Sequence, residues 1–445
     1  MGTQSQIEEA SRETQVPHWS FVKRLAFRFC FSYFGLYCLT TQILGGLFLI
    51  TKFSIDPATL WPMRQITLWT AAHIFGIMHP LVYMGSGSGD KTFNWVETFC
   101  TLVLALLTTG IWSVLDRQRD NYVTLDKWFR LFVRFALASA MFSYGMIKVI
   151  PLQMPFPFLT RFVEPFGNFT PMGVLWNFIG ASPVYEGFTG CAEMLGGILL
   201  IVPRTTMLGT LICLTDLTQV FLLNMAYDVP VKLLSFHLIL MGLFLLVPEL
   251  PRLVSFFFLN RAAGPSTQPQ LFQTCRANRV ALGVQLIFAI YLVGTNIYTS
   301  WSGWYAYGSG RPKSTFYGIW NVDQLSVDSQ LRSPLLTDYD RWHRVIFDFP
   351  TSVNFQRMDD SFVGYGATIN VNDRTIELTK ANDEVWRAEF TFQRPALDQL
   401  ILDGNMDNHM IHMRLRLVDR DTFLLANSRF HWIAEYPFNR LEVRR

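Results

Sequence analysis

The sequence predicts a multi-pass α-helical membrane bundle of about eight helices, followed by a C-terminal antiparallel β-barrel or sandwich. Two observations support this fold class. The first 300 residues contain mainly apolar runs of about 20 residues, the length that a helix needs to cross the hydrocarbon core of a bilayer. After residue 300 the apolar residues fall in short alternating segments separated by turn residues, which is the pattern of antiparallel strands.

The composition agrees with a membrane protein. Of the 445 residues, 50% are hydrophobic and only 16% are charged, whereas a soluble globular protein carries about a quarter of charged residues. A net charge of +3, without a basic cluster interleaved with aromatic residues, gives no sign of a nucleic-acid partner. The six cysteines form no CxxC pair, so the sequence predicts neither a zinc site nor a disulfide framework.

Three domains are expected: a polar N-terminal segment (1–25), a transmembrane helical domain (26–300) and a soluble β domain (301–445). The connection between the fourth and fifth helices is rich in Pro, Phe and Gly, which favours an interfacial or partly re-entrant segment over a straight span. The expected helices cover residues 27–51, 65–85, 93–115, 129–151, 183–203, 205–226, 230–249 and 279–299.

Basic residues in the loops give conflicting signals on orientation. An excess of Lys and Arg marks cytoplasmic loops, and with eight helices the two most basic loops lie on the same side, which we expect to be the cytoplasm. The C-terminal domain would then face outward, toward the periplasm of a bacterium. Three basic residues before the first helix indicate the opposite orientation. The basic loop residues are Arg117, Arg119, Lys127, Arg130, Arg252, Arg261, Arg276 and Arg279, against Lys23, Arg24 and Arg28.

Ionisable residues inside the expected spans are candidates for function. Each costs at least ~2.5–3.5 kcal/mol at the middle of a membrane, although long side chains near a helix end reach the interface at lower cost. The candidates are His73, His79, Glu97, Arg134, Lys148, Glu186, Glu193, Asp216, Asp228, Lys232 and His237.

Two of these candidates, Asp228 and Lys232, are expected to pair, because residues four apart share a face of a helix. Pro230 suits the first turn of that helix, and an acidic residue near a helix N-terminus is favoured by the helix dipole. The pair is therefore either a capped helix start or a charge pair at the mouth of a buried polar site. His237 lies deeper and off that face, where a hydrogen-bonded core histidine is the ordinary alternative to a ligand.

A second pair is expected around Glu193. Gly190, Gly196 and Gly197 surround this residue and allow close helix packing, and its candidate partners are Arg134 and Lys148. Structural and functional roles both remain open for such a pair.

Lys148 itself stands near the end of its helix, where snorkelling to the interface is the alternative to a functional role. Tyr144 lies four residues earlier and shares its face.

His79 precedes Pro80, so the second helix is expected to be kinked there. His73 and His79 are six residues apart and do not share a helix face, which argues against a two-histidine metal site. The sequence contains no HExxH, GxSxG, P-loop or GxGxxG motif. No metal site is predicted.

The segments "YGMIKVIP" and "CAEMLGGILLIVPRTT" resemble the DoxX-like membrane family. The resemblance implies a four-helix unit associated with membrane redox chemistry, including quinone-linked sulfur oxidation. The arrangement of about eight helices and a β-rich C-terminal part also looks loosely like the HTTM group, in whose vitamin K-dependent carboxylase a membrane lysine acts as base. No motif transfers that role to Lys148 or Lys232.

The C-terminal domain begins with "YGIWNV", and its Gly318-x-Trp320 is similar to the start of the first strand of lipocalin-type barrels. That resemblance implies an arginine from the last strand above the tryptophan, and Arg429 is the matching residue. A generic small β-barrel or sandwich without a ligand is the alternative. His409 and His412 are three residues apart and point to opposite faces of a strand, which argues against shared metal binding.

The leading hypothesis is a bacterial, DoxX-like, redox-associated membrane protein that handles a quinone or lipid-like molecule in a polar intramembrane cavity. A quinone is the candidate cofactor, and membrane lipid and a redox protein are the expected partners. If the chain is an enzyme, it is a membrane oxidoreductase or a subunit of one. The alternatives are a non-enzymatic carrier of apolar ligands and a structural subunit of a membrane complex. The expected catalytic residues are Lys148, Glu193, Lys232 and His237, and the expected cofactor-binding residues are His79, Tyr144 and Asp228.

Overall fold

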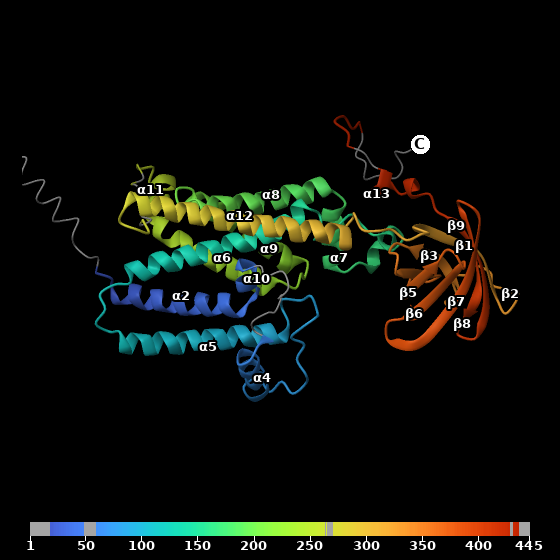
Figure 1. Cartoon of the computed structure of the whole chain (residues 1–445), viewed down its shortest axis with the longest axis horizontal. Helices are drawn as coiled ribbons and strands as arrows, with labels where there is room; N and C mark the ends of the chain where they lie inside the picture. The colour runs from blue at the N-terminus through green and yellow to red at the C-terminus, as the bar shows by residue number, and fades with distance from the viewer. Residues whose placement is uncertain (1–17, 49–58, 263, 265–269, 428–429, 436–445) are drawn as a thin grey trace, which may run out of the picture. The chain divides into compact units, whose positions relative to one another are not determined.

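The computed structural model describes residues 18–48, 59–262, 264, 270–427 and 430–435 (Figure 1). Most of the polar N-terminal segment therefore lies outside the described residues. The chain forms two compact units. The first unit is helical and contains the chain up to Gln153 together with Val184–Ser302, and the second contains Met154–Pro183 and the chain from Gly303 onward.

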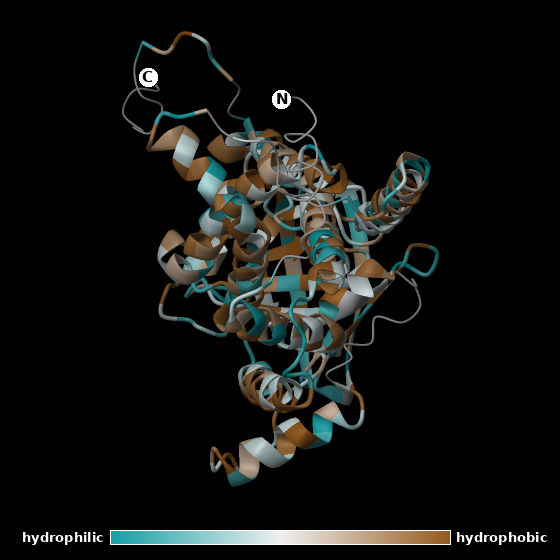
Figure 2. Ribbon diagram, turned by 90° about the vertical axis from the view of Figure 1, so that its left-hand side faces the viewer, coloured by the Kyte–Doolittle hydropathy of each residue, from teal (hydrophilic) through white to brown (hydrophobic). Residues whose placement is uncertain are grey.

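Within the described residues, six helical segments are long and apolar enough to cross a membrane, whereas the sequence predicted about eight. Figure 2 shows brown, apolar residues alternating with white and teal ones over the helices. The segments are α5 (Thr92–Leu115), α6 (Val123–Val149), α8 (Pro183–Ile201), α9 (Thr206–Ala226), α10 with η4 and α11 (Lys232–Phe257), and α12 (Cys275–Ala306).

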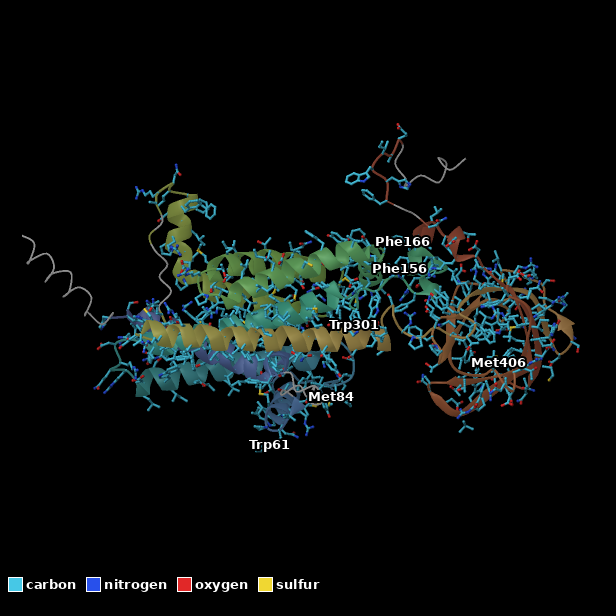
Figure 3. All side chains as sticks on the ribbon, turned by 45° about the horizontal axis from the view of Figure 1, so that its top comes forward. Trp61, Met84, Phe156, Phe166, Trp301 and Met406 are labelled. Carbon is cyan, nitrogen blue, oxygen red and sulfur yellow. The ribbon has the colours of Figure 1, made fainter. Side chains whose placement is uncertain are left out.

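The second expected span is much shorter than the sequence suggested. Helix α4 (Met63–His73) has 11 residues and is about 16 Å long, too short to cross a bilayer. The chain from residue 74 to 91 is irregular, and three of its four glycines, Gly76, Gly85 and Gly87, adopt positive φ. Trp61, just before α4, and Met84, in this segment, are both exposed (Figure 3). The run looked like a span because of its apolar composition, but its Gly and Pro residues interrupt the helix.

The first expected span is also divided. Helix α2 (Phe21–Thr40) is followed by the short α3 (Gln42–Leu47), with a break at Thr41. The first turns of α2 carry Lys23, Arg24 and Arg28.

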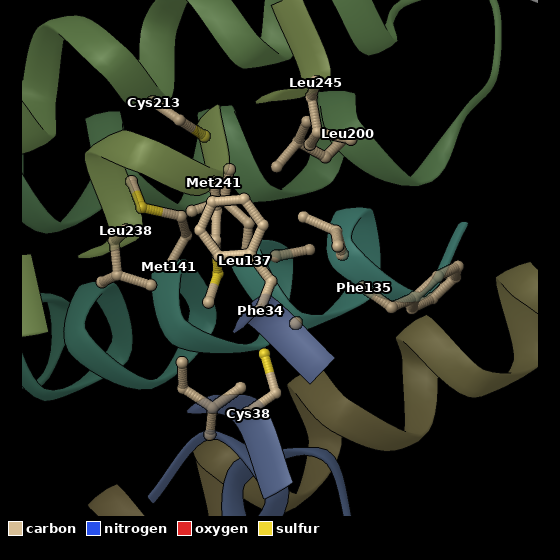
Figure 4. Close-up of a cluster of buried hydrophobic side chains, with 14 of the residues drawn as sticks. Phe34, Cys38, Phe135, Leu137, Met141, Leu200, Cys213, Leu238, Met241 and Leu245 are labelled. Atoms are coloured by element: carbon tan, nitrogen blue, oxygen red, sulfur yellow. The ribbon is translucent and has the colours of Figure 1, made fainter. Parts of the chain in front are cut away.

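Helix α6 forms the centre of the helical unit. In the most apolar 18-residue stretch of α6, 67% of the residues are buried, whereas the same measure is 22% in α5 and in α12. Leu137 and Met141 of α6 pack with Phe34 of α2 and Met241 of α10 (Figure 4). Functional groups on α6 therefore face neighbouring helices and not lipid.

Hydrogen bonds show which helix ends lie together. Lys127 at the start of α6 donates to the carbonyl oxygen of Gln270, just before α12, at 3.0 Å. Arg28 near the start of α2 donates to the carbonyl oxygen of Asp116, which follows α5, at 2.8 Å. We call this side of the unit the basic end. Its basic residues are Lys23, Arg24, Arg28, Arg117, Arg119, Lys127, Arg130, Arg204, Arg252, Arg261, Arg276 and Arg279.

The second unit contains a closed antiparallel barrel of eight strands, with the short β2 as an extra ribbon on β1, which confirms the predicted fold class. Neighbouring strands pair in sequence order from β3 to β9, and β9 pairs with β1 to close the barrel. The strands are β1 (Gly318–Val327), β2 (Gln330–Leu331), β3 (Trp342–Phe347), β4 (Ser352–Arg357), β5 (Phe362–Asn370), β6 (Thr375–Lys380), β7 (Asp383–Ala396), β8 (Gln399–Met406) and β9 (His409–Leu417).

The Gly318-x-Trp320 motif opens the first strand as expected. Trp320 is fully buried in the barrel core and donates from Nε1 to the carbonyl oxygen of Phe316 at 2.9 Å. Gly318 has φ +153°, and a Cβ there would lie 2.4 Å from Leu417 Cδ1, so the position favours glycine. Arg429, the residue expected above Trp320, lies outside the described residues.

The segment expected at the membrane interface packs in part against the barrel. It contains η2 (Leu159–Phe162), η3 (Phe166–Asn168) and α7 (Pro171–Gly180). The Leu159 amide donates to Asp348 Oδ2 at 2.9 Å, and the Gln356 side chain donates to the carbonyl oxygen of Val163 at 3.0 Å. Leu159 also packs on the outward-facing Ile346 of β3. Leu159 is thus buried by the sheet, a partner that composition alone does not reveal, whereas Phe166 and Phe178 remain exposed.

Candidate functional site

A buried ion pair joins two spanning helices of the first unit. The ammonium of Lys148, near the end of α6, donates to Glu193 Oε1 in the middle of α8. The two side chains are only 8% and 7% exposed. Burying two charges costs several kcal/mol each, which their attraction offsets only when they are in direct contact. Each charge therefore depends on the other.

Glycines bring α8 close enough to its neighbours for this pair to form. A Cβ on Gly190 would lie 2.6 Å from the Gly145 carbonyl oxygen of α6. On the side of α9, a Cβ on Gly196 would lie 2.8 Å from Cys213 Sγ. Helix α8 is thus packed tightly between α6 and α9, as expected for small residues at membrane helix interfaces.

Asp216 of α9 is a third charged group at this site. It is close enough to Glu193 and Lys148 to interact electrostatically with both. Asp216 Oδ2 and Glu193 Oε2 are buried and have no hydrogen-bond partner among the described residues. Glu193 lies about 15 Å along α8 from its first residue, and Asp216 lies about the same distance from the last residue of α9. Both are therefore near the middle of their helices.

A groove between α8 and α9 leads to this site. Its volume is about 360 Å³, and its wall is mainly apolar. Asp216 is its charged lining residue, and Thr215 beside it supplies a hydroxyl. Binding sites for small molecules are typically apolar hollows with a few well-placed polar groups. The residues that line the groove are Ala192, Leu195, Leu211, Ile212, Thr215 and Asp216.

The charges of Lys148, Glu193 and Asp216 determine how many protons the site holds. With one ammonium and two carboxyl groups, the site is neutral only when one carboxyl group holds a proton. A charge imbalance is costly in a low-dielectric environment, so gain of a negative charge favours uptake of a proton. The carboxyl group that borders the groove is the one able to exchange that proton with a bound molecule.

Tyr144 lies beside the ion pair, one helical turn before Lys148. Its hydroxyl accepts a hydrogen bond of 3.2 Å from Gln42 of α3, and the ring is close enough to Glu193 to interact with it electrostatically. Of the expected site residues, the structure therefore brings Lys148, Glu193 and Tyr144 together.

The expected pair of Asp228 and Lys232 also forms, with 2.7 Å between Oδ1 and Nζ, but the Asp228 side chain is 84% exposed. It does not cap the helix. Asp90 does, by accepting hydrogen bonds from the amides of Lys232 at 2.8 Å and Leu233 at 2.9 Å. Asp228 itself has φ +54° and lies before α10, which starts at Lys232. This pair stabilises a helix start and belongs to a different cluster from Lys148.

His237 is a packed core residue. Its Nε2 lies 2.7 Å from the Tyr33 hydroxyl and its Nδ1 lies 2.6 Å from the Leu233 carbonyl oxygen. The ring also stacks on Tyr37, with 3.9 Å between the centroids. Both ring nitrogens are therefore engaged by these neighbours. His79 differs, because it is exposed in the irregular segment after α4 and lies on no helix.

Other candidates also have separate partners. Arg134, a proposed partner of Glu193, instead donates to Gln285 of α12 and, at 3.4 Å, to Thr206 Oγ1 of α9. In the barrel, His409 pairs with Asp328 and His412 with Asp403, so the two histidines do not converge. No group of three or more potential metal ligands occurs within the described ranges.

Sequence reasoning named Asp216 as an ionisable residue in a span but did not include it in the site. Asp90 was missed altogether. Asp216 lies three residues after Cys213, so the two residues share a face of α9. Cys213 faces α8, but the sequence alone does not show which helix that face contacts.

The six spans and the closed barrel define the chain as a multi-pass membrane protein with a C-terminal β-barrel domain. A stretch of 127 residues is 35% identical to the uncharacterized protein YwoB of Bacillus subtilis (strain 168), covering 26% of this chain and 72% of that protein. The chain belongs to the same family as YwoB over this stretch. No family model and no solved structure matches the chain.

Proposed function

We propose that the protein binds a membrane quinone in the groove between α8 and α9 and exchanges a proton with it through Asp216. One observation carries this proposal. A mainly apolar groove at mid-helix depth ends at a carboxyl group that is coupled to a buried Lys148–Glu193 ion pair. Structural ion pairs are ordinary in proteins, but an additional acid without a hydrogen-bond partner on one oxygen is costly in a membrane and favours a functional role.

A quinone matches the groove in three respects. It dissolves in the bilayer, so it reaches the groove from lipid. Its apolar tail suits wall residues such as Leu195 and Ile212. Its ring oxygens accept hydrogen bonds from Asp216 and Thr215 in the oxidised form and donate hydrogen bonds to them in the reduced form. Its reduction takes up two electrons and two protons, so a carboxyl group at the ring is chemically useful. The resemblance to DoxX-like proteins points to the same chemistry.

In this proposal a redox protein bound to the chain supplies the two electrons. Asp216 delivers one of the two protons to the quinone, and water supplies the other. The carboxylate left behind gives the site a net negative charge, because the Lys148 ammonium is already paired with Glu193, and Asp216 then takes up another proton. Glu193 holds the Lys148 ammonium in place between transfers. The chain then acts as an oxidoreductase subunit.

The distribution of charge supports an orientation for this reaction. Because residues 74–91 do not form a span, the start of α2 lies at the same end as the other basic connections, and all of these basic residues favour the same orientation. We propose that the basic end faces the cytoplasm. Helix α12 starts at this end, so the barrel that follows it is on the outer, periplasmic side of a bacterial membrane.

Binding of decylubiquinone to the purified full-length protein in detergent tests the proposal. Leu195→Trp fills the groove and should abolish binding, and Asp216→Asn should weaken binding of the reduced form about tenfold through loss of a charge-assisted hydrogen bond. Asp228→Asn, which makes the same chemical change at an exposed pair, should bind like the wild type. Wild-type affinity in both groove variants would refute the proposal.

A further inference from the structure

A buried arginine without an acidic partner lies in the helical unit, away from the proposed quinone site. Arg134 of α6 is 7% exposed. Its guanidinium donates to Gln285 Oε1 and to Thr206 Oγ1, both uncharged, and its Nε is buried without a hydrogen-bond partner in the described part of the chain. Among the described residues, no carboxylate forms an ion pair with it or acts on it electrostatically.

The surroundings of Arg134 add positive charge. Thr206 is the first residue of α9, a helix of 21 residues, and the start of a helix carries a partial positive charge of about +0.5. The exposed Arg204 lies two residues before this start. A guanidinium remains charged at any physiological pH. Two positive groups therefore face each other at a buried position, an arrangement that costs several kcal/mol unless an anion is present.

We propose that Arg134 and the start of α9 bind the phosphate group of an anionic phospholipid. Guanidinium groups bind phosphate through two parallel hydrogen bonds, and free amides at a helix start are ordinary phosphate ligands. The Arg134 Nε and the first-turn amides of α9 supply such donors. The site is on the side of the basic end, where α9 begins and lipid phosphates lie close to the helix starts.

The test measures the thermal stability of the full-length protein, purified in detergent and stripped of lipid. Phosphatidylglycerol should raise the Tm by several degrees more than phosphatidylcholine does, because a ligand that binds only the folded state stabilises it. Arg134→Met should lose this difference and, without lipid, should be at least as stable as the wild type, since it removes an uncompensated charge. If inorganic phosphate raises the Tm as much as phosphatidylglycerol does, and Arg134→Met abolishes this rise, the site is supported and its ligand is free phosphate.

Two controls make the result decisive. Lys127→Met removes another cation at the basic end, one that is engaged by the Gln270 carbonyl oxygen, and should keep the full response to phosphatidylglycerol. An equal response of the wild type to both lipids would overturn the proposal, as would an equal loss in Lys127→Met and Arg134→Met. If Arg134→Met does not fold, native mass spectrometry of the wild type decides, since preferential retention of phosphatidylglycerol is expected and equal retention contradicts it.

Discussion

Removal of Lys148 should destabilise the helical unit more than removal of the Glu193 charge. The Lys148→Met variant leaves two carboxyl groups, Glu193 and Asp216, without a cation. Breaking a buried ion pair on one side typically costs about 3–5 kcal/mol. Both side chains are less than a tenth exposed, so we expect Lys148→Met to lie in this range.

Glu193→Gln should cost less, about 1–3 kcal/mol. The amide still accepts a hydrogen bond from the ammonium, and Asp216 remains to neutralise Lys148. The double variant should be less destabilised than the sum of the two single variants, by more than about 1 kcal/mol, because it removes both charges of a coupled pair.

The assay is equilibrium unfolding of the full-length protein in detergent, followed by circular dichroism of the helices. Asp228→Asn is the control, since its pair is exposed and should contribute at most about 1 kcal/mol. Additive effects of Lys148→Met and Glu193→Gln within about 0.5 kcal/mol would refute the coupling, and so would a larger cost for Glu193→Gln than for Lys148→Met.

Three further predictions concern other parts of the structure. Gly190→Ala places a Cβ against backbone atoms of α6 and should cost about 1–3 kcal/mol, whereas Gly187→Ala, with open space around it, should be neutral or stabilising in the same unfolding assay. Asp90→Ala should cost about 0.5–2 kcal/mol through loss of the α10 cap, more than Asp228→Ala, and an equal cost would contradict the capping role. Burial lowers the pKa of His343 in the barrel below 6.5. On acidification the unfolded chain therefore binds a proton at His343 before the folded protein does. The stability contributed by the neutral histidine is complete above pH 6.5 and is lost as the pH falls toward the folded-state pKa. His343→Gln should flatten this loss in thermal unfolding between pH 8 and pH 5, and an unchanged slope would contradict it.

The sequence was informative where the pattern is local. Residues four apart predicted the pair of Asp228 and Lys232, and the glycines around Glu193 predicted close packing against neighbouring helices, both of which the structure contains. Alternation after residue 300 predicted an antiparallel barrel or sandwich, and the structure contains the barrel. In each case the physical cause lies within one helix or one run of strands.

The remaining features depend on partners that are distant in the chain. Asp90 caps a helix that starts 142 residues later, and periodicity does not identify such a partner. Asp216 joins Lys148 and Glu193 only because α9 packs on α8 in one particular orientation. The apolar composition around Leu159 predicts an interfacial segment but does not reveal that the outer face of the barrel buries Leu159 itself.

The most direct test of the account is the site at which a photoreactive quinone reacts with the protein. An azidoquinone, irradiated with the full-length protein in native membranes and traced by mass spectrometry of peptides, should label the groove residues of α8 and α9, such as Leu195 and Ile212. An excess of decylubiquinone should suppress that label. Labelling confined to other helices or to the barrel, or labelling that competitor leaves unchanged, would contradict a quinone site at Asp216.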